Sequence, residues 1–122
     1  MIVIVMGMHR SGTSALAGVL HQNGIIMGEP EDFRYPPVSE NPKGFFENYF
    51  FRALNDQILY QNGYSAKSFS PMTPDHIDVT EQDTSIMRSL LSQYDKRYTT
   101  WGFKDPRMCL TYSAWKPFLQ KP

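Results

Sequence analysis

An uninterrupted apolar run that leads straight into a glycine-containing turn constrains this chain more than any other feature. Residues 2–6 read Ile-Val-Ile-Val-Met, a β-branched run typical of a strand covered on both faces of a parallel sheet. Residues 13–22 then follow helical spacing until Asn23-Gly24 supplies a helix stop signal. The apolar positions of that helix are Leu16, Val19 and Leu20. The sequence therefore predicts a central strand, a turn and a helix in direct succession.

The turn has the spacing of a phosphate-binding loop. Residues 7–14 read Gly-Met-His-Arg-Ser-Gly-Thr-Ser, which fits G-x-x-x-x-G followed by two hydroxyl residues. Backbone N–H groups of such a turn, together with the helix dipole, bind phosphate oxygens. Thr13 stands where nucleoside triphosphatases have the Lys that reaches the β and γ phosphates, so a magnesium triphosphate loses its usual anchor. The cation of this loop is Arg10, and the alternative to a phosphate site is a plain strand-to-helix turn.

Two helices and two irregular segments are predicted in the middle of the chain. Residues 28–44 contain four prolines and several carboxylates, which predicts a long loop, and residues 65–78 form a second irregular segment. The helix between them ends at Asn62-Gly63, and the next helix follows Thr80, which with Asp83 resembles a capping box. The apolar stripes of the two helices are Phe46, Phe50, Leu54 and Ile58, and Ile86, Leu90, Leu91 and Tyr94.

A second strand brings a lysine to the end of the predicted sheet. Residues 99–103 have strand composition, and Asp105-Pro106 then supplies a helix start, with Asp as N-cap and Pro as first helical residue. Lys104 therefore lies at the carboxyl end of a strand, where open α/β sheets bind ligands next to helix amino termini. If the two strands are adjacent and parallel, the Lys104 ammonium approaches the loop of residues 7–13.

The predicted fold class is α/β, with a P-loop-like parallel sheet flanked by helices. The last helix of the pattern covers residues 108–119 and is rich in aromatic side chains. Only two strands are evident, and two strands do not make a stable doubly wound sheet. We therefore expect the domain to be incomplete at its carboxyl end.

Composition narrows the range of partners. The chain has 12 Lys and Arg residues and 12 Asp and Glu residues, so no basic excess favours nucleic acid or an anionic membrane. Cys109 is the single cysteine, and together with the three histidines it gives no metal-ligand spacing, so no metal site is expected. Neither a signal peptide nor an apolar run of the roughly 20 residues needed for a membrane span is evident. We expect a cytoplasmic protein of one domain.

The turn resembles a loop of a known enzyme family. Residues 9–14, His-Arg-Ser-Gly-Thr-Ser, are similar to the 5′-phosphosulfate-binding loop of sulfotransferases that use 3′-phosphoadenosine 5′-phosphosulfate (PAPS). The resemblance implies that Arg10 contacts the phosphosulfate bridge and that backbone and hydroxyl donors hold the phosphate without a metal. The implied cofactor-binding residues are Gly7, His9, Arg10, Ser11, Gly12, Thr13 and Ser14. For His9 the alternative is a packing or hydrogen-bonding role.

Three further segments resemble parts of the same family, in the same order. Residues 28–33, Gly-Glu-Pro-Glu-Asp-Phe, are similar to the Gly-Glu-Pro loop of some bacterial members, in which a carboxylate acts as general base. Residues 41–48, Asn-Pro-Lys-Gly-Phe-Phe-Glu-Asn, resemble a segment common in bacterial sulfotransferase-like proteins. Lys104-Asp105-Pro106 resembles the Lys-Asp-Pro of tyrosylprotein-type members, in which the Lys faces the sulfuryl group.

The resemblance implies in-line transfer of a sulfuryl group from PAPS to a hydroxyl or amine of a small-molecule or glycan acceptor. Arg10 and Lys104 would stabilise charge on the sulfuryl oxygens and on the departing phosphate, while a carboxylate removes the acceptor proton. Asp32 and Glu29 are preferred as that base over Glu47, whose alternative role near a helix start is interaction with the helix dipole. For Lys104 the alternative is an ion pair with a nearby carboxylate.

The chain departs from the family pattern at its carboxyl end. Members bind the 3′-phosphate with an Arg after a later strand and a Ser beyond it, and the nearest pair here, Arg107 and Ser113, is too closely spaced. Residues 1–122 are therefore expected to be the amino-terminal part of a sulfotransferase-like domain, without the 3′-phosphate-binding half. Two alternatives stay open. One is a P-loop small-molecule kinase, and the other is a non-catalytic nucleotide- or phosphate-binding module whose exposed apolar surface favours a homodimer.

Overall fold

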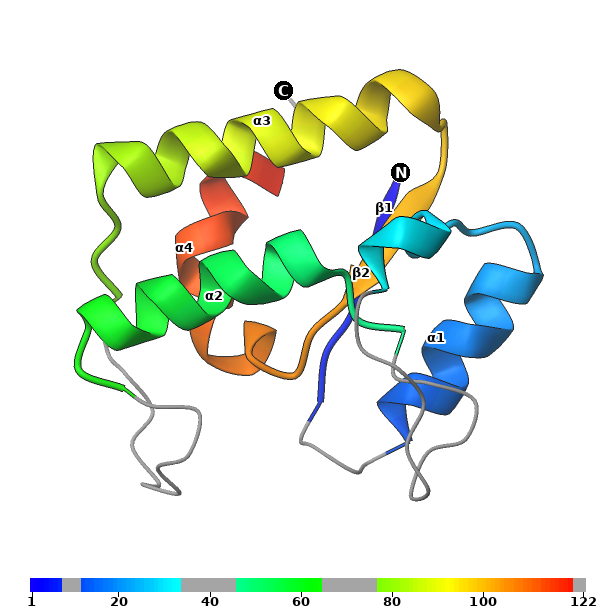
Figure 1. Cartoon of the computed structure of the whole chain (residues 1–122), viewed down its shortest axis with the longest axis horizontal. Coiled ribbons are helices and arrows are strands. Elements are labelled where there is room, and N and C mark those ends of the chain that lie inside the picture. Colours follow the sequence, from blue (N-terminus) through cyan, green and yellow to red (C-terminus); the bar gives the residue numbers. More distant parts are fainter. Residues whose placement is uncertain (8–11, 34–45, 65–76, 120–122) are drawn as a thin grey trace.

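The fold is of the α/β class, with helices on both sides of a small parallel sheet (Figure 1). The computed structural model describes residues 1–7, 12–33, 46–64 and 77–119. In chain order the elements are β1 (Ile2–Val5), α1 (Thr13–Gln22), the short 3₁₀-helix η1 (Pro30–Asp32), α2 (Tyr49–Gln61), α3 (Glu81–Arg97), β2 (Trp101–Lys104) and α4 (Met108–Leu119). None of the helices in these ranges is long and apolar enough to cross a membrane.

The two strands are parallel neighbours, as the sequence predicts. Ile2 lies opposite Trp101 and Val5 opposite Lys104, so the carboxyl ends of both strands meet at one edge of the sheet. The close approach depends on Gly102, because a Cβ atom at this position would lie 2.2 Å from the carbonyl oxygen of Val3. The parallel pair therefore brings the end of β2 next to the start of the glycine-containing turn.

The expectation that β1 is the central strand is not met in the described part of the chain. There β1 pairs with β2 alone, and three of its four residues are only half-buried. All four residues of β2 are buried, and its other side carries isolated parallel bridges from Ile26 to Trp101 and from Glu47 to Lys104. The inner strand is thus β2, because segments that lead into η1 and α2 pass along its free side.

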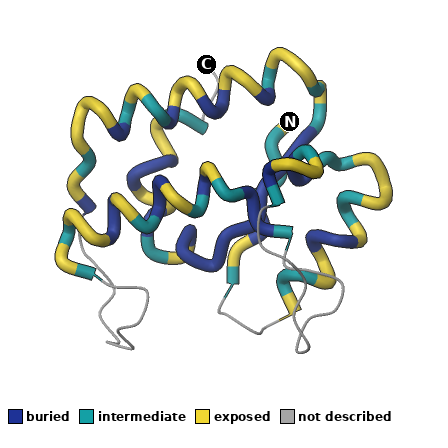
Figure 2. The backbone as a smooth tube through the Cα atoms, in the orientation of Figure 1, coloured by how far each residue is buried: buried dark blue, intermediate teal, exposed yellow. Residues whose placement is uncertain are grey.

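Two hydrophobic clusters hold the layers together. The larger one packs α2, α3 and α4 around the aromatic side chains of β2, and Phe51 of α2 stacks on Phe103 with ring centroids 4.0 Å apart. The smaller one joins Val5 of β1 to Ala17 of α1 and Met27. Figure 2 shows buried backbone concentrated along β2 and on the inward sides of α2 and α3. The sheet therefore separates a one-helix layer from a three-helix layer.

Helix boundaries agree with the local stop and start signals. Helix α1 ends before Asn23-Gly24 and α2 ends before Asn62-Gly63, and both Gly24 and Gly63 have positive φ. The capping box of α3 is confirmed, since the Thr80 hydroxyl accepts a hydrogen bond from Asp83 N–H and the Asp83 carboxylate accepts one from Thr80 N–H. These signals act within one turn of helix, which is why the sequence alone reveals them.

The apolar stripe expected for α2 is partly wrong. Leu54 and Ile58 are buried, but Phe46 precedes the helix with φ 54° and Phe50 is 39% exposed. The aromatic ring that enters the core is that of Phe51. Because the helix begins at Tyr49, the regular spacing from Phe46 to Phe50 does not lie on one helical face.

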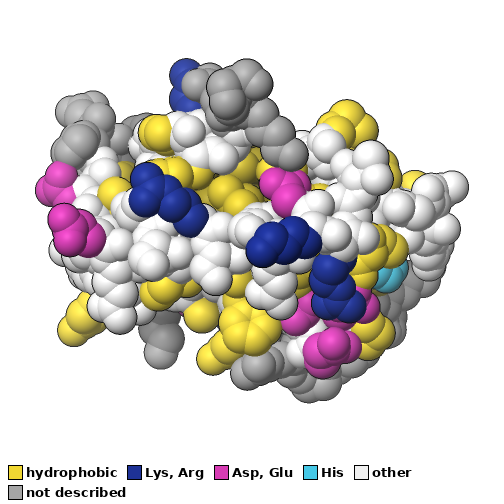
Figure 3. Space-filling view, turned by 90° about the horizontal axis from the view of Figure 1, so that it is seen from above, with side chains coloured by type: hydrophobic (Ala, Val, Ile, Leu, Met, Phe, Trp, Pro, Cys, Tyr) yellow, Lys and Arg dark blue, Asp and Glu magenta, His cyan; other side chains and the backbone are white. Residues whose placement is uncertain are grey.

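The apolar stripe expected for α1 is only partly correct, because Leu20 alone of its three members packs against the smaller hydrophobic cluster. Leu16 and Val19 are 53% and 56% exposed, whereas Ala17 and Gly18 face the interior. A Cβ atom at Gly18 would lie 3.1 Å from the Phe46 ring, so a side chain there would have to displace that ring slightly. On the face shown in Figure 3, exposed hydrophobic side chains lie among basic and acidic ones, and no large area carries a single sign of charge.

Helix α4 covers the predicted residues 108–119, but the prediction that Asp105 is its N-cap and Pro106 its first residue is wrong. Asp105 and Pro106 belong to a turn, closed by a hydrogen bond from Met108 N–H to the Asp105 carbonyl oxygen at 3.0 Å, and the helix itself begins at Met108. The Asp105 side chain does accept a backbone hydrogen bond, from Arg107 N–H at 3.1 Å. Asp105 therefore caps the turn that leads into the helix.

Candidate functional site

The candidate site centres on Lys104, the last residue of β2. Its ammonium donates a hydrogen bond to the Ser14 hydroxyl at 3.1 Å and forms an ion pair with Glu47 Oε1 at 2.9 Å. The side chain is 3% exposed, so its charge lies away from bulk water. The parallel pairing of β1 and β2 brings Lys104 to this position, because Ser14 follows β1 across the turn and stands in the first turn of α1.

Gly12 is the last residue of the turn before α1. Gly12 has φ 88° in the left-handed region, where a residue with a Cβ atom is strained, and it directly precedes α1. It caps α1 without a side-chain hydrogen bond. Gly7, Thr13 and Ser14 are also described, whereas His9, Arg10 and Ser11 lie outside the described residues. The Lys104 ammonium contacts Ser14 in the first turn of α1, so its charge and the positive end of the helix dipole lie side by side.

Glu47 is the predicted carboxylate that contacts Lys104. It is 6% exposed and forms a second ion pair, from its Oε2 atom to Arg52 at 3.3 Å. Its backbone forms an isolated parallel bridge with Lys104, and the next residue, Asn48, caps α2 by accepting a hydrogen bond from Phe50 N–H. Position 47 is therefore fixed both by β2 and by the start of α2.

The other two predicted carboxylates have partners elsewhere. Asp32 is buried in η1, where its Oδ2 atom accepts hydrogen bonds from the Tyr94 hydroxyl and, at 2.9 Å, from Glu29 N–H. The Glu29 carboxylate lies 3.3 Å from the guanidinium of Arg97 at the end of α3. The structure therefore brings Glu47 to Lys104 and gives Asp32 and Glu29 contacts with α3.

A buried hydrogen-bond chain connects η1, α3 and α2. The Tyr94 hydroxyl donates to Asp32 and accepts from the Asn48 amide at 2.6 Å. Burial is the largest cause that raises the pKa of Tyr94 above its usual value near 10, and the hydrogen bond to Asp32 raises it further. The tyrosine therefore stays protonated, as a donor to the Asp32 carboxylate must.

The residue after Lys104 belongs to a separate polar cluster. Asp105 has no exposed surface and accepts hydrogen bonds from Asn55 at 2.9 Å and from Arg107, whose guanidinium also pairs with Asp56. Burial raises the pKa of Asp105, although Arg107 and Asn55 act in the opposite direction. For Arg107, burial acts to lower the pKa, but Asp105 and Asp56 outweigh it and raise the value. The Arg107 guanidinium is therefore occupied by carboxylates of its own chain, and Ser113 is exposed on α4.

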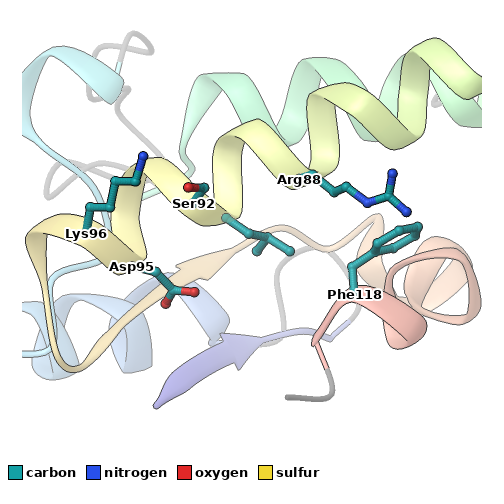
Figure 4. A pocket seen from close by; sticks show the side chains of 6 residues that line it. Arg88, Ser92, Asp95, Lys96 and Phe118 are labelled. Atoms are coloured by element: carbon teal, nitrogen blue, oxygen red, sulfur yellow. The ribbon is translucent and has the colours of Figure 1, made fainter. Parts of the chain in front are cut away.

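A shallow groove of about 410 Å³ lies between α3 and the end of α4 (Figure 4). Arg88, Ser92 and Lys96 line it along one side of α3, and Arg88 lies over the ring of Phe118 at 5.2 Å from its centroid. Asp95, which also borders the groove, accepts a hydrogen bond from the indole of Trp101. No sequence motif marks this groove, since its residues on α3 share only their spacing along an amphipathic helix.

The sequence predicts Lys104 beside the turn and offers an ion pair with a nearby carboxylate as its alternative role, which Glu47 confirms, but it identifies neither Glu47 nor Ser14 as the partner. The Glu47 contact joins residues 57 positions apart, and the Tyr94 contact with Asp32 spans 62 positions. The local signal near Glu47 was its place before a helix start, which pointed to the helix dipole instead.

Comparisons with models of protein families, with curated proteins and with solved structures find no match to this chain.

Proposed function

We propose that this chain binds the 5′-phosphosulfate of PAPS at the turn after β1 and transfers the sulfuryl group to an acceptor hydroxyl or amine. The observation that carries the proposal is the contact between Lys104 and Ser14, which joins the end of β2 to a turn with the sequence of a phosphosulfate-binding loop. A buried lysine at the amino terminus of a helix favours an anion there. A P-loop-like sheet is part of the same proposal.

Each residue has a role in this proposal. Gly12, Thr13 and Ser14 hold the 5′-phosphate through backbone and hydroxyl donors, and Arg10 approaches the bridge between phosphate and sulfur. The acceptor oxygen or nitrogen attacks sulfur, the bond from sulfur to the bridging oxygen breaks, and adenosine 3′,5′-bisphosphate leaves. Lys104 and Arg10 stabilise the charge that develops on the transferring oxygens. The acceptor proton passes to a carboxylate, for which Asp32, Glu29 and Glu47 remain the candidates.

The contacts of Asp105 disfavour a kinase. A P-loop kinase needs a Lys at position 13 and an Asp at a strand end to hold magnesium, and Asp105 is the residue at such a place. Its carboxylate is buried and already accepts hydrogen bonds from Asn55 and Arg107. The residues present therefore suit a phosphosulfate better than a magnesium triphosphate.

A second candidate function is a phosphate-binding module without turnover. The observation that favours it is the engagement of Arg107 by Asp105 and Asp56, which leaves this arginine bound within the protein rather than facing a 3′-phosphate. In that case the turn and Lys104 bind the 5′-side of the nucleotide alone. Weak binding of adenosine 3′,5′-bisphosphate without sulfuryl transfer would identify this function.

Calorimetry of nucleotide binding, with and without a chelator, tests the proposal. We expect adenosine 3′,5′-bisphosphate to bind weakly and equally well in the presence of EDTA, because the site uses backbone and cationic groups. Incubation with sulfur-labelled PAPS and a panel of phenols, amines and sugars then separates transfer from binding alone. Tighter, magnesium-dependent binding of ATP would contradict the sulfotransferase proposal in favour of a kinase.

A further inference from the structure

Glu47 joins two cations at the candidate site. One carboxylate oxygen pairs with Lys104 at 2.9 Å and the other with Arg52 at 3.3 Å, and the carboxylate is almost fully buried. Each oxygen of this carboxylate thus faces a different cation. Its two oxygens are therefore committed to orienting neighbouring side chains.

The backbone of Glu47 is anchored beside that of Lys104. The parallel bridge between Glu47 and Lys104 places the two main chains side by side. The next residue, Asn48, accepts a hydrogen bond from Phe50 N–H in the first turn of α2. Asn48 also donates to the Tyr94 hydroxyl, which connects this point to α3. The carboxylate is thus attached where β2, α2 and α3 meet, whereas the lysine has a flexible four-carbon stem.

We propose that Glu47 is a positioning residue that holds the Lys104 ammonium against Ser14, with Arg52 fixing the carboxylate from its other side. This inference rests on the proposed function, because it concerns the lysine that faces the transferring group there. It assigns Glu47 a different role from that of a general base, since a base must approach the acceptor and Glu47 is paired on both oxygens.

The direction in which Glu47→Gln changes anion affinity distinguishes a positioning role from a purely electrostatic one. Glu47→Gln removes a negative charge close to an anion-binding turn, and long-range electrostatics alone would then strengthen anion binding. Loss of positioning acts in the opposite direction, because the lysine is no longer held in place. Weaker binding in this variant is therefore specific for positioning.

Trace acylation of lysines, quantified residue by residue by mass spectrometry, is the first measurement. In the native protein we expect Lys104 to react far more slowly than Lys96 and Lys116, which are exposed on α3 and α4. In Glu47→Gln the Lys104 rate should rise about tenfold, the effect of losing one charge-assisted hydrogen bond, while Lys96 and Lys116 keep their rates. Glu47→Asp restores the charge and should return part of the protection.

Arg52→Gln is the matched variant in case Glu47→Gln does not fold. Arg52 is 25% exposed, so its loss is expected to leave the fold intact, and it removes the second support of Glu47 while keeping the ion pair to Lys104. We expect a smaller rise in Lys104 acylation, about threefold. An unchanged Lys104 rate in Glu47→Gln, or in Arg52→Gln where Glu47→Gln does not fold, would overturn the inference.

Calorimetry with adenosine 3′,5′-bisphosphate is the second measurement. Glu47→Gln should weaken binding several-fold, and tighter binding would show that Glu47 competes with the anion, which overturns the inference. If the native protein binds no nucleotide, the proposed function fails, and the acylation rates alone then decide whether Glu47 positions Lys104. The two failures are therefore distinguishable.

Discussion

Lys104 and Asp105 are neighbours in the chain, yet they belong to two buried polar clusters with different character. The Lys104 cluster joins the inner strand to Ser14 at the start of α1 and to Glu47. The Asp105 cluster lies on the three-helix side and joins Asn55 of α2 to Arg107. Successive side chains at a strand end point to opposite faces, which separates the two clusters.

The difference lies in what each cluster connects. Asp105 is bound by residues of α2 and of the turn before α4, and Asn55 also accepts a hydrogen bond from the Trp115 indole at 2.7 Å, so this cluster ties the helices of one layer to the sheet. The Lys104 cluster instead reaches the glycine-containing turn on the other side. A Lys-Asp-Pro sequence therefore combines a residue suited to binding with a residue that holds the fold, and substitutions at the two positions should separate these roles.

Asp105→Ala is expected to have the largest effect. It removes the acceptor of the Asn55 amide and one of the two carboxylates paired with the buried Arg107 guanidinium, and loss of one partner of a buried charge costs about 3–5 kcal/mol. Chemical denaturation followed by far-UV circular dichroism measures the change. An unfolding free energy within about 1 kcal/mol of the native value would show that the Asp105 cluster does not stabilise the fold.

Lys104→Met should act mainly on binding. It removes a cation from the anion site, so affinity for adenosine 3′,5′-bisphosphate should fall by about 1.5–3 kcal/mol, or roughly 10- to 150-fold. The fold should lose less than in Asp105→Ala, because Arg52 still pairs with Glu47. Calorimetry together with denaturation gives both values. Equal losses of unfolding free energy in Lys104→Met and Asp105→Ala would contradict the view that only the Asp105 cluster mainly stabilises the fold.

Arg10→Ala should lower affinity without affecting the fold. Arg10 is the cation inside the turn, so loss of its charge-assisted hydrogen bonds should weaken binding by about 1.5–3 kcal/mol. The melting temperature of the unliganded protein should stay unchanged. A variant that melts much earlier would identify Arg10 as a structural residue and place it with Asp105 rather than with Lys104.

Tyr94→Phe should have the smallest effect and a characteristic pH dependence. The loss of its hydroxyl removes a donor to Asp32 and an acceptor for Asn48, at a cost of about 1–2 kcal/mol at neutral pH. Because folding raises the pKa of Tyr94, its contribution is present below pH about 10 and is lost as the pH rises above the unfolded value. Unfolding free energies of both proteins from pH 7 to 11 should therefore converge above pH 10. A constant difference would contradict the raised pKa.

Features set by nearby residues could be predicted from the sequence, and contacts between distant segments could not. The Thr80 and Asp83 capping box involves residues within a single turn of helix. Lys104 lies close to the glycine-containing turn because β1 and β2 are adjacent and parallel. The buried residues of α2 begin at Phe51 and follow it at i+3, i+4, i+7 and i+8, so they form the face of an amphipathic helix. The predicted stripe at intervals of four residues from Phe46 starts one position too early within that helix.

The carboxylates of the candidate site show the same division. Glu47 was recognised as a candidate from its sequence context, but its two ion pairs depend on how the segment before α2 crosses the end of β2. Asp32 and Glu29 are the preferred bases because they lie in the loop that resembles the Gly-Glu-Pro loop, whereas in the structure the Asp32 carboxylate is bound by Tyr94 from α3. A partner 62 residues away leaves no signal in the local pattern.

Chemical-shift mapping by NMR tests the central claim most directly, namely that an anionic nucleotide binds where the parallel strands end. Titration with adenosine 3′,5′-bisphosphate in the presence of EDTA should shift the amide signals of Gly7, Gly12 and Ser14 and that of Lys104, while the groove between Arg88 and Phe118 stays unchanged. Shifts confined to the groove, or no shifts in the turn at millimolar nucleotide, would contradict the account.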